Sequence, residues 1–183
     1  MVTINKVLWR LQMAAAICFN LANSIWFMEH KDKDVLLDLE WINENLNTTG
    51  EPLVQNLTSN FVAQLKLLRN YVIQLFEKGS LDDQLNDLNL FLKNDISFPQ
   101  LVETNEGLTV IKTSLASVEE RILSNIVLAM IQLVNDQSMS RIHRCDNADC
   151  QFYFMDMSKN QSKKYCSIKC NNVAKVRRYR AKL

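Results

Sequence analysis

The chain of 183 residues has few of the residues that interrupt helices, with only 3 glycines and 2 prolines. Their scarcity favours long helices over a fold with many turns. No apolar run reaches the roughly 18 residues that a membrane helix requires. Histidine is scarce as well, being confined to His30 and His143. Because the sequence also lacks a Gly-rich phosphate loop, a G-x-S-x-G motif and a histidine-based triad, we expect neither a membrane protein nor an enzyme.

An apolar stretch near the N-terminus, residues 11–21, follows Lys6 and Arg10 and superficially resembles a signal peptide. Gln12 and Asn20 interrupt it, and a helical stripe explains its pattern better. The chain also has five cysteines, an odd number whose spacing is that of metal ligands. Such cysteines suit a reducing compartment better than disulfide formation, so we expect a cytoplasmic protein.

Positive and negative charges are unevenly distributed along the chain, although the net charge is only +1. Residues 1–140 hold 10 Lys and Arg against 17 Asp and Glu, whereas residues 141–183 hold 11 Lys and Arg against 3 Asp. A basic segment of this density is typical of proteins that bind an anionic partner, nucleic acid above all. The alternative is that the basic segment docks on the acidic body of its own chain.

Apolar residues recur at spacings of three and four over most of residues 1–138, which predicts a body of five helices. Asp32 or Asp34 is expected to cap the second helix. Pro52 is expected in the first turn of the third helix, and Gly79 at its end. The predicted core positions are, helix by helix, Leu8, Leu11, Ala15, Cys18 and Ala22; Leu36, Leu39, Ile42 and Leu46; Val54, Leu57, Phe61, Leu65, Leu68, Val72 and Leu75; Leu81, Leu85, Leu88 and Leu92; and Val118, Ile122, Ile126, Met130 and Leu133.

Two capping patterns predict helix starts in the body, and one break in periodicity predicts a β-hairpin. Ser80 with Asp83 forms a weak capping box for the fourth helix, and Ser117 with Glu120 forms a proper one for the fifth. Residues 96–113 lose the helical spacing and predict a β-hairpin with a glycine-bearing turn. The predicted fold is therefore mainly α, a helical bundle with one small β-hairpin.

Four of the five cysteines lie near the C-terminus, in the pattern Cys145-x4-Cys150-x15-Cys166-x3-Cys170. Two cysteine pairs of this spacing are typical of one structural zinc ion with four thiolate ligands and no open position for catalysis. Residues 151–157 are expected to be extended, with Phe152 and Phe154 on one side and Tyr153 and Met155 on the other, and residues 163–165 return toward Cys166. This pattern predicts a short hairpin between the pairs and a helix after them. We therefore expect a treble-clef-like zinc finger at residues 139–183, behind a helical domain at residues 1–138. Cys18, by contrast, lies on an apolar helix face and is expected to be an inert buried residue.

The residues around the second cysteine pair resemble a known family. Phe154–Asn160, Lys163–Ser167 and Cys170–Val176 are similar to the CGNR zinc finger, and Ala16–Ser24 resembles the opening segment of the ABATE domain that precedes this finger in the family. The resemblance implies a bacterial regulator of transcription induced by stress. Two positions differ from the eponymous motif, because Asn171 replaces its glycine and Val173 its arginine. We expect the metal site to tolerate Asn171, whereas Val173 removes one candidate contact to a phosphate or a base.

The basic residues around and beyond the last cysteine suggest double-stranded DNA as the partner, because they neutralise phosphates and an α-helix fits the major groove. RNA and an acidic protein partner remain alternatives that the sequence does not separate. The helical body is expected to act as a sensor, for which nothing in the sequence names a small-molecule effector, or as a domain that forms a homodimer. The predicted nucleic-acid contacts are Lys163, Lys164, Lys169, Lys175, Arg177, Arg178 and Arg180.

Overall fold

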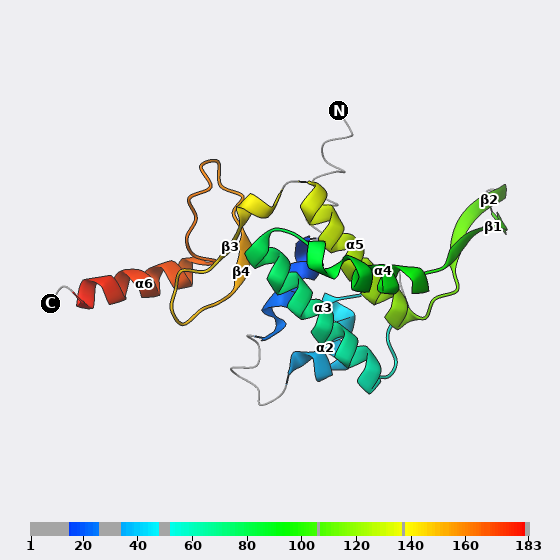
Figure 1. The fold of residues 1–183 in the computed structure, drawn as a ribbon, viewed down its shortest axis with the longest axis horizontal. Helices are drawn as coiled ribbons and strands as arrows, with labels where there is room; N and C mark the ends of the chain where they lie inside the picture. The colour runs from blue at the N-terminus through cyan, green and yellow to red at the C-terminus, as the bar shows by residue number, and fades with distance from the viewer. Residues whose placement is uncertain (1–14, 26–33, 48–51, 106, 137, 182–183) are drawn as a thin grey trace.

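The computed structural model describes residues 15–25, 34–47, 52–105, 107–136 and 138–181. Residues 15–23 are helical, and the helices and strands after them are shown in Figure 1. They are the 3-10 turn η2 (Val35–Leu37), α2 (Leu39–Asn45), α3 (Ser59–Lys78), the 3-10 turn η3 (Asp82–Gln84), α4 (Leu85–Asn94), β1 (Ser97–Thr104), β2 (Gly107–Ser114), α5 (Val118–Asn135), the 3-10 turn η4 (Ser138–Arg141), β3 (Ile142–Arg144), β4 (Tyr153–Met155) and α6 (Ile168–Arg180). The predicted fold class, mainly α with small hairpins, is confirmed. In the described ranges, no helix is both long enough and apolar enough to cross a membrane.

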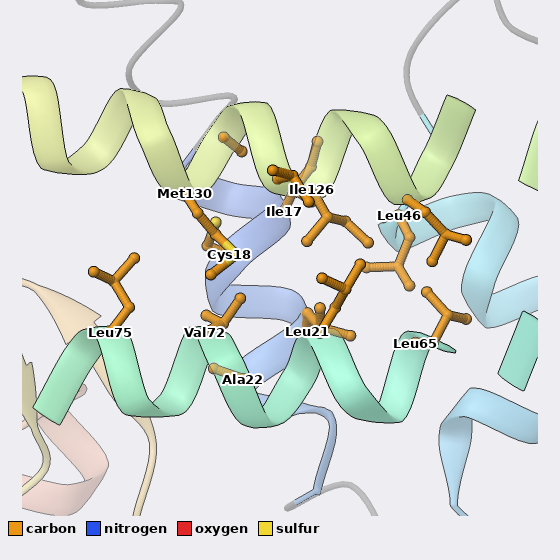
Figure 2. Close-up of a cluster of buried hydrophobic side chains, with 14 of the residues drawn as sticks. Ile17, Cys18, Leu21, Ala22, Leu46, Leu65, Val72, Leu75, Ile126 and Met130 are labelled. Atoms are coloured by element: carbon orange, nitrogen blue, oxygen red, sulfur yellow. The ribbon is translucent and has the colours of Figure 1, made fainter. Parts of the chain in front are cut away.

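The core of the body lies between α3 and α5, with the helical segment 15–23 inserted between them (Figure 2). Cys18 lies in this cluster and is fully buried, as predicted, and its burial raises the pKa of the thiol. A thiol in such surroundings stays protonated and packs as a small apolar group. The predicted core positions Leu8 and Leu11 lie outside the described residues.

The third helix begins later than the sequence predicted. Pro52 is not in its first turn, because residues 52–58 are not helical and α3 begins at Ser59. Thr58 caps α3 by accepting a hydrogen bond from the Phe61 amide at 3.1 Å. The Asn43 side chain bonds both the amide and the carbonyl of Val54, at 2.9 and 3.0 Å, and so holds the preceding segment against α2. These side-chain bonds, which apolar periodicity does not reveal, decide where the helix starts.

Two aspartates before the second helix cap different elements. Asp34 accepts a hydrogen bond from the Leu36 amide and caps η2, whereas Asp38 caps α2 by accepting from the Trp41 amide. Asp34 therefore does cap a turn, but it is not the cap of α2, and the other candidate, Asp32, lies outside the described residues.

The fourth helix also differs from its predicted start. The capping box at Ser80 and Asp83 is absent from the described structure, because the chain makes the turn η3 there and α4 begins at Leu85 without a side-chain cap. The turn rotates the helix start so that Leu85 is exposed, while Leu88 and Phe91 face the core. Gly79, in the left-handed region at φ 77°, ends α3 as predicted.

The hairpin and the fifth helix agree with the sequence prediction. β1 and β2 pair antiparallel from Ser97 opposite Ser114 to Thr104 opposite Gly107. Ser117 and Glu120 form both bonds of the predicted capping box at the start of α5. In Figure 1 the β1–β2 hairpin extends away from the bundle on one side, and α6 extends away on the other.

Candidate metal centre and basic arm

The four cysteines of the C-terminal segment come together in the structure. Their Sγ atoms all lie within 4.8 Å of one another. The Sγ atom of Cys166 lies 3.7 Å from that of Cys150 and 3.6 Å from that of Cys170. Ligands of a tetrahedral zinc ion with Zn–S bonds of about 2.3 Å are about 3.8 Å apart, so these separations fit one zinc ion.

Backbone hydrogen bonds form the loop that presents the first two cysteines. Cys145 follows β3 and its amide donates to the Phe152 carbonyl at 2.9 Å, while the Cys150 amide donates to the Asn147 carbonyl at 2.8 Å. The Cys166 amide in turn approaches the Cys145 sulfur at 3.4 Å. An N–H group directed at a sulfur stabilises the thiolate form that binds metal.

The second pair of cysteines is placed by the start of α6. Ser167 caps α6 and its hydroxyl accepts from the Cys170 amide at 3.2 Å. Cys170 therefore lies in the first helical turn, while Cys166 precedes the helix. The positive end of the helix dipole favours negative charge on the Cys170 sulfur.

The thiols differ in acidity because their hydrogen bonds differ. Burial raises the pKa of Cys150 and Cys166, and hydrogen bonds with neighbouring thiols add to the increase at Cys166. Burial also acts to raise the pKa of Cys170, but hydrogen bonds with Ser167, Asn147 and the other thiols outweigh it and lower the pKa to about 7. Zinc binding must displace the remaining thiol protons, so the affinity for zinc falls in acid.

Four cysteine ligands satisfy the tetrahedral preference of zinc completely. The donor set and the sulfur separations thus fit a structural zinc ion held by Cys145, Cys150, Cys166 and Cys170. The metal would cross-link the loop after β3 to the first turn of α6, which no strand pairing joins in the described part of the chain.

The short hairpin of this segment is not the one predicted. β4 pairs with β3, through Ile142 opposite Met155 and Arg144 opposite Tyr153, and not with residues 163–165. A buried carboxylate, Asp156, explains the difference, because its two oxygens accept from the Ser158 and Lys163 amides at 2.7 Å each. These bonds hold the connection between the cysteine pairs as a closed loop.

The β3–β4 hairpin is packed against the helical body. Ile142 and Tyr153 belong to the same buried cluster as the bundle, and the Tyr153 ring lies 5.3 Å from that of Phe76 on α3. Asn23 bonds both backbone groups of Tyr153, accepting from its amide at 2.8 Å and donating to its carbonyl at 3.0 Å. The Tyr153 hydroxyl donates to Glu77 at 2.9 Å.

Sequence reasoning did not identify Asn23 as a contact with the C-terminal segment. In the sequence, Asn23 and Ser24 were notable only as part of a poor signal-peptide cleavage site and as the end of a segment, residues 16–24, that resembles a family segment. In the structure both are buried, and Ser24 accepts from the Arg69 guanidinium at 3.1 Å while Asn23 holds β4. The signal in the sequence was a pair of polar residues, Asn and Ser, at the end of an apolar helix, because buried polar groups require hydrogen-bond partners.

The sequence of the C-terminal segment also matches a known family. Residues 141–182 match the CGNR zinc finger. The match covers the cysteine centre and α6, and the ABATE domain expected for the N-terminal part stays a prediction. No curated protein matches the chain.

The two positions that differ from the family motif, Asn171 and Val173, lie in α6. The Asn171 amide donates to the Ser167 carbonyl at 3.1 Å, within the helix, so the position does not require a glycine. Val173 lies one helical turn before Arg177, which bonds Asp149 in the loop between the first two cysteines and approaches Asn147 at 3.5 Å. Arg177 therefore ties α6 to the loop of residues 145–150, called the metal loop, from the same helix face on which the family motif has its arginine.

The seven predicted nucleic-acid contacts are all exposed. Lys163 and Lys164 lie in the loop before Cys166, and the Lys163 ammonium lies 5.2 Å from the centre of the Phe154 ring. The other five are on α6, whose residues are all exposed or half-buried. The basic helix is thus not packed on the acidic body in this structure, and Arg177 pairs with the finger itself.

Proposed function

We propose that this chain is a bacterial regulator of transcription that binds double-stranded DNA through α6. The observation that carries the proposal is the exposure of α6, a helix of 13 residues that has no acidic residue and extends away from the bundle (Figure 1). At about 1.5 Å per residue it is about 20 Å long, and a helix of that size enters the major groove of DNA.

The basic residues of α6 would divide their roles. Lys169, Lys175, Arg178 and Arg180 are exposed and would neutralise phosphates or contact base edges. Arg177 is half-exposed and pairs with Asp149, so its role would be to set the angle of α6 relative to the metal loop. A bound zinc ion would hold the start of this helix in place and would supply no chemistry of its own.

The helical body would serve as a sensor or an oligomerisation domain. The hydrogen bonds that Tyr153 donates to Glu77 and exchanges with Asn23 attach the finger to α3 and to the N-terminal helical segment. A change in the packing of these helices would therefore reach the finger through β4.

Fluorescence anisotropy with a labelled DNA duplex at several salt concentrations tests the proposal. Four phosphate contacts, one for each of these exposed residues of α6, would give a slope of log affinity against log salt of about −3.6, and R178A and R180A should each reduce its magnitude by about 1. K93A, which removes an exposed lysine from α4, is the matched control and should leave binding unchanged.

Binding that is absent, or that does not respond to salt, would contradict the proposal. Competition with a structured RNA separates the two nucleic acids, since an RNA that displaces the duplex at lower concentration assigns the arm to RNA. A partner that is still captured after nuclease treatment would instead assign it to an acidic protein.

A further inference from the structure

The β1–β2 hairpin is a second exposed arm, at the opposite side of the bundle from α6 (Figure 1). Each strand has eight residues, and all eight pairs of the register are formed. Leu101, Leu108 and Val110 nevertheless remain 63%, 71% and 63% exposed. A two-stranded hairpin is at best marginally stable alone in water, and three or more strands with an apolar face are needed for independent stability.

Both faces of the hairpin carry apolar side chains. Leu101 and Val110 are direct partners and share one face with Leu108, because paired residues point to the same side and alternate residues to opposite sides. Phe98 and Ile111, which are 41% and 44% exposed, lie on the other face. The bundle covers neither face, so an additional strand is the natural way to bury part of this surface.

The two outer edges of the hairpin are not equivalent. The Leu115 amide donates to the Ile96 carbonyl at 2.9 Å, directly beyond the last registered pair. Because bonded and non-bonded pairs alternate in an antiparallel ladder, the pairs containing Pro99, Leu101, Leu108 and Val110 direct their backbone groups outward. Pro99 therefore lacks a donor where β1 would pair with another strand, whereas Leu108 and Val110 present theirs at the edge of β2.

We infer that β2 pairs with β2 of a second copy of this chain, giving a four-stranded antiparallel sheet across a two-fold axis. Two identical strands that pair antiparallel are related by such an axis, so the contact is self-complementary. The run from Leu108 to Ile111 contains no charge, no proline and no glycine, and an exposed edge of this composition is able to pair with another strand. On β1, Pro99 blocks the equivalent contact.

The chemistry of the hairpin favours a protein strand over a nucleic acid. The two strands carry one acidic residue, Glu103 on β1, and one basic residue, Lys112 on β2, so they have no net charge, and the exposed residues from Leu108 to Ile111 are aliphatic or threonine. The basic residues that suit an anionic partner lie on α6. The inference therefore concerns assembly and does not depend on DNA binding.

Sedimentation equilibrium of the full-length, zinc-loaded chain, without nucleic acid, tests the inference. The wild type should approach the mass of two chains as its concentration rises. V110P removes an outward-facing amide from β2, as Pro99 does on β1, and should give the mass of one chain. L101P is the matched control, because it removes an outward-facing amide from the opposite edge, and it should still dimerise.

A second substitution tests whether V110P prevents dimerisation merely by unfolding the hairpin. V110K keeps the backbone amide but brings like charges together across the axis, and it too should be monomeric. A wild type that is monomeric at every concentration, a V110P variant that remains dimeric, or equal dissociation of V110P and L101P would each overturn the inference. None of these outcomes changes the anisotropy result expected for α6.

Discussion

The helical body and the zinc finger are stabilised in different ways. In the body, side chains such as Leu65, Leu68, Ile126 and Met130 are completely buried, and burial of apolar area accounts for its stability. In the finger, every residue from Cys166 to Arg180 is exposed or half-buried. A segment with so little buried surface needs a cross-link, and four cysteines with a metal provide one.

The change from one kind of stabilisation to the other occurs inside the finger. β3 and β4 share the core of the bundle through Ile142 and Tyr153, whereas the metal loop and α6 lie beyond it. We therefore expect the loss of metal to affect the loop that joins β3 to β4 and the chain after β4, and to spare the paired strands themselves. Conversely, weakening the bundle should leave the four sulfur ligands intact.

The largest expected effect is that of removing a metal ligand. C166A should lower the zinc content from about one ion per chain to near zero, because binding of structural zinc contributes about 10–16 kcal/mol and needs all four ligands. Zinc analysis and limited proteolysis measure the result. New cleavage is expected at Lys163, Lys164 and along α6, while α3 and α5 remain protected.

C18A is the matched control for this prediction, since it removes the buried cysteine of the bundle. It should destabilise the body by leaving a small cavity but keep the zinc content unchanged. A C166A chain that retains its zinc, or that loses the bundle together with the finger, would contradict the division described above.

A smaller effect is expected from the buried ion pair of the body. Arg69 donates two hydrogen bonds of 3.0 Å to the carboxylate of Asp34, and both side chains are at most 10% exposed. D34N should lower the free energy of unfolding by about 3 kcal/mol at neutral pH, because it leaves the Arg69 charge buried without its partner. Urea unfolding measures the difference.

The same pair predicts a pH dependence. Burial acts to raise the pKa of Asp34, but hydrogen bonds with Arg69 and the Leu36 amide, together with the charges of Arg69 and Lys66, outweigh it and lower the pKa below its ordinary value of 3.8. A lowered folded pKa means that ionised Asp34 stabilises the fold fully above 3.8 and less as the pH falls through the folded value. The difference in the free energy of unfolding between the wild type and D34N should therefore become smaller in acid.

D83N is the control for the ion pair, because Asp83 lies 3.6 Å from Lys78 at the surface with both side chains more than half exposed. It should change the stability by less than about 1 kcal/mol at any pH. Equal effects of D34N and D83N would show that burial of the first pair has no influence on the stability of the body.

The smallest expected effect is at the contact between the two regions. Y153F removes the hydroxyl that bonds Glu77 but keeps the ring against Phe76, so it should cost about 1 kcal/mol in the unfolding of the body. Burial and Glu77 raise the pKa of this tyrosine to about 12, so the hydroxyl is protonated and able to donate at neutral pH.

The zinc content should not change in Y153F, because the substitution removes only the bond to Glu77, while Asn23 still bonds the backbone of Tyr153 beside the metal loop. Y71F is the matched control, since the Tyr71 hydroxyl bonds Asp87 at an exposed site. Loss of this bond should lower the free energy of unfolding by less than Y153F does. A Y153F chain that loses zinc would show that the metal loop depends on the contact with the bundle.

Periodicity and spacing predicted those parts of the fold that depend on local chemistry. Gly79 ends α3 and Ser117 caps α5 because each acts on backbone groups within one helical turn. The four cysteines were recognisable because metal ligands in zinc fingers recur at short intervals. The predicted start of α3 was wrong, because the segment before this helix is held by the side chain of Asn43, which belongs to another helix.

The sequence by itself determined the mainly helical fold, the central stripe of α3, and a zinc centre built from Cys145, Cys150, Cys166 and Cys170. Only the tertiary structure decided that β4 pairs with β3, that Asn23 holds β4 from 130 residues away, and that Arg177 is tied to the metal loop. The physical reason is the range of the interactions. Apolar periodicity, caps and ligand spacing act over a few residues, whereas the pairing of buried polar groups depends on which segments the folded core brings together.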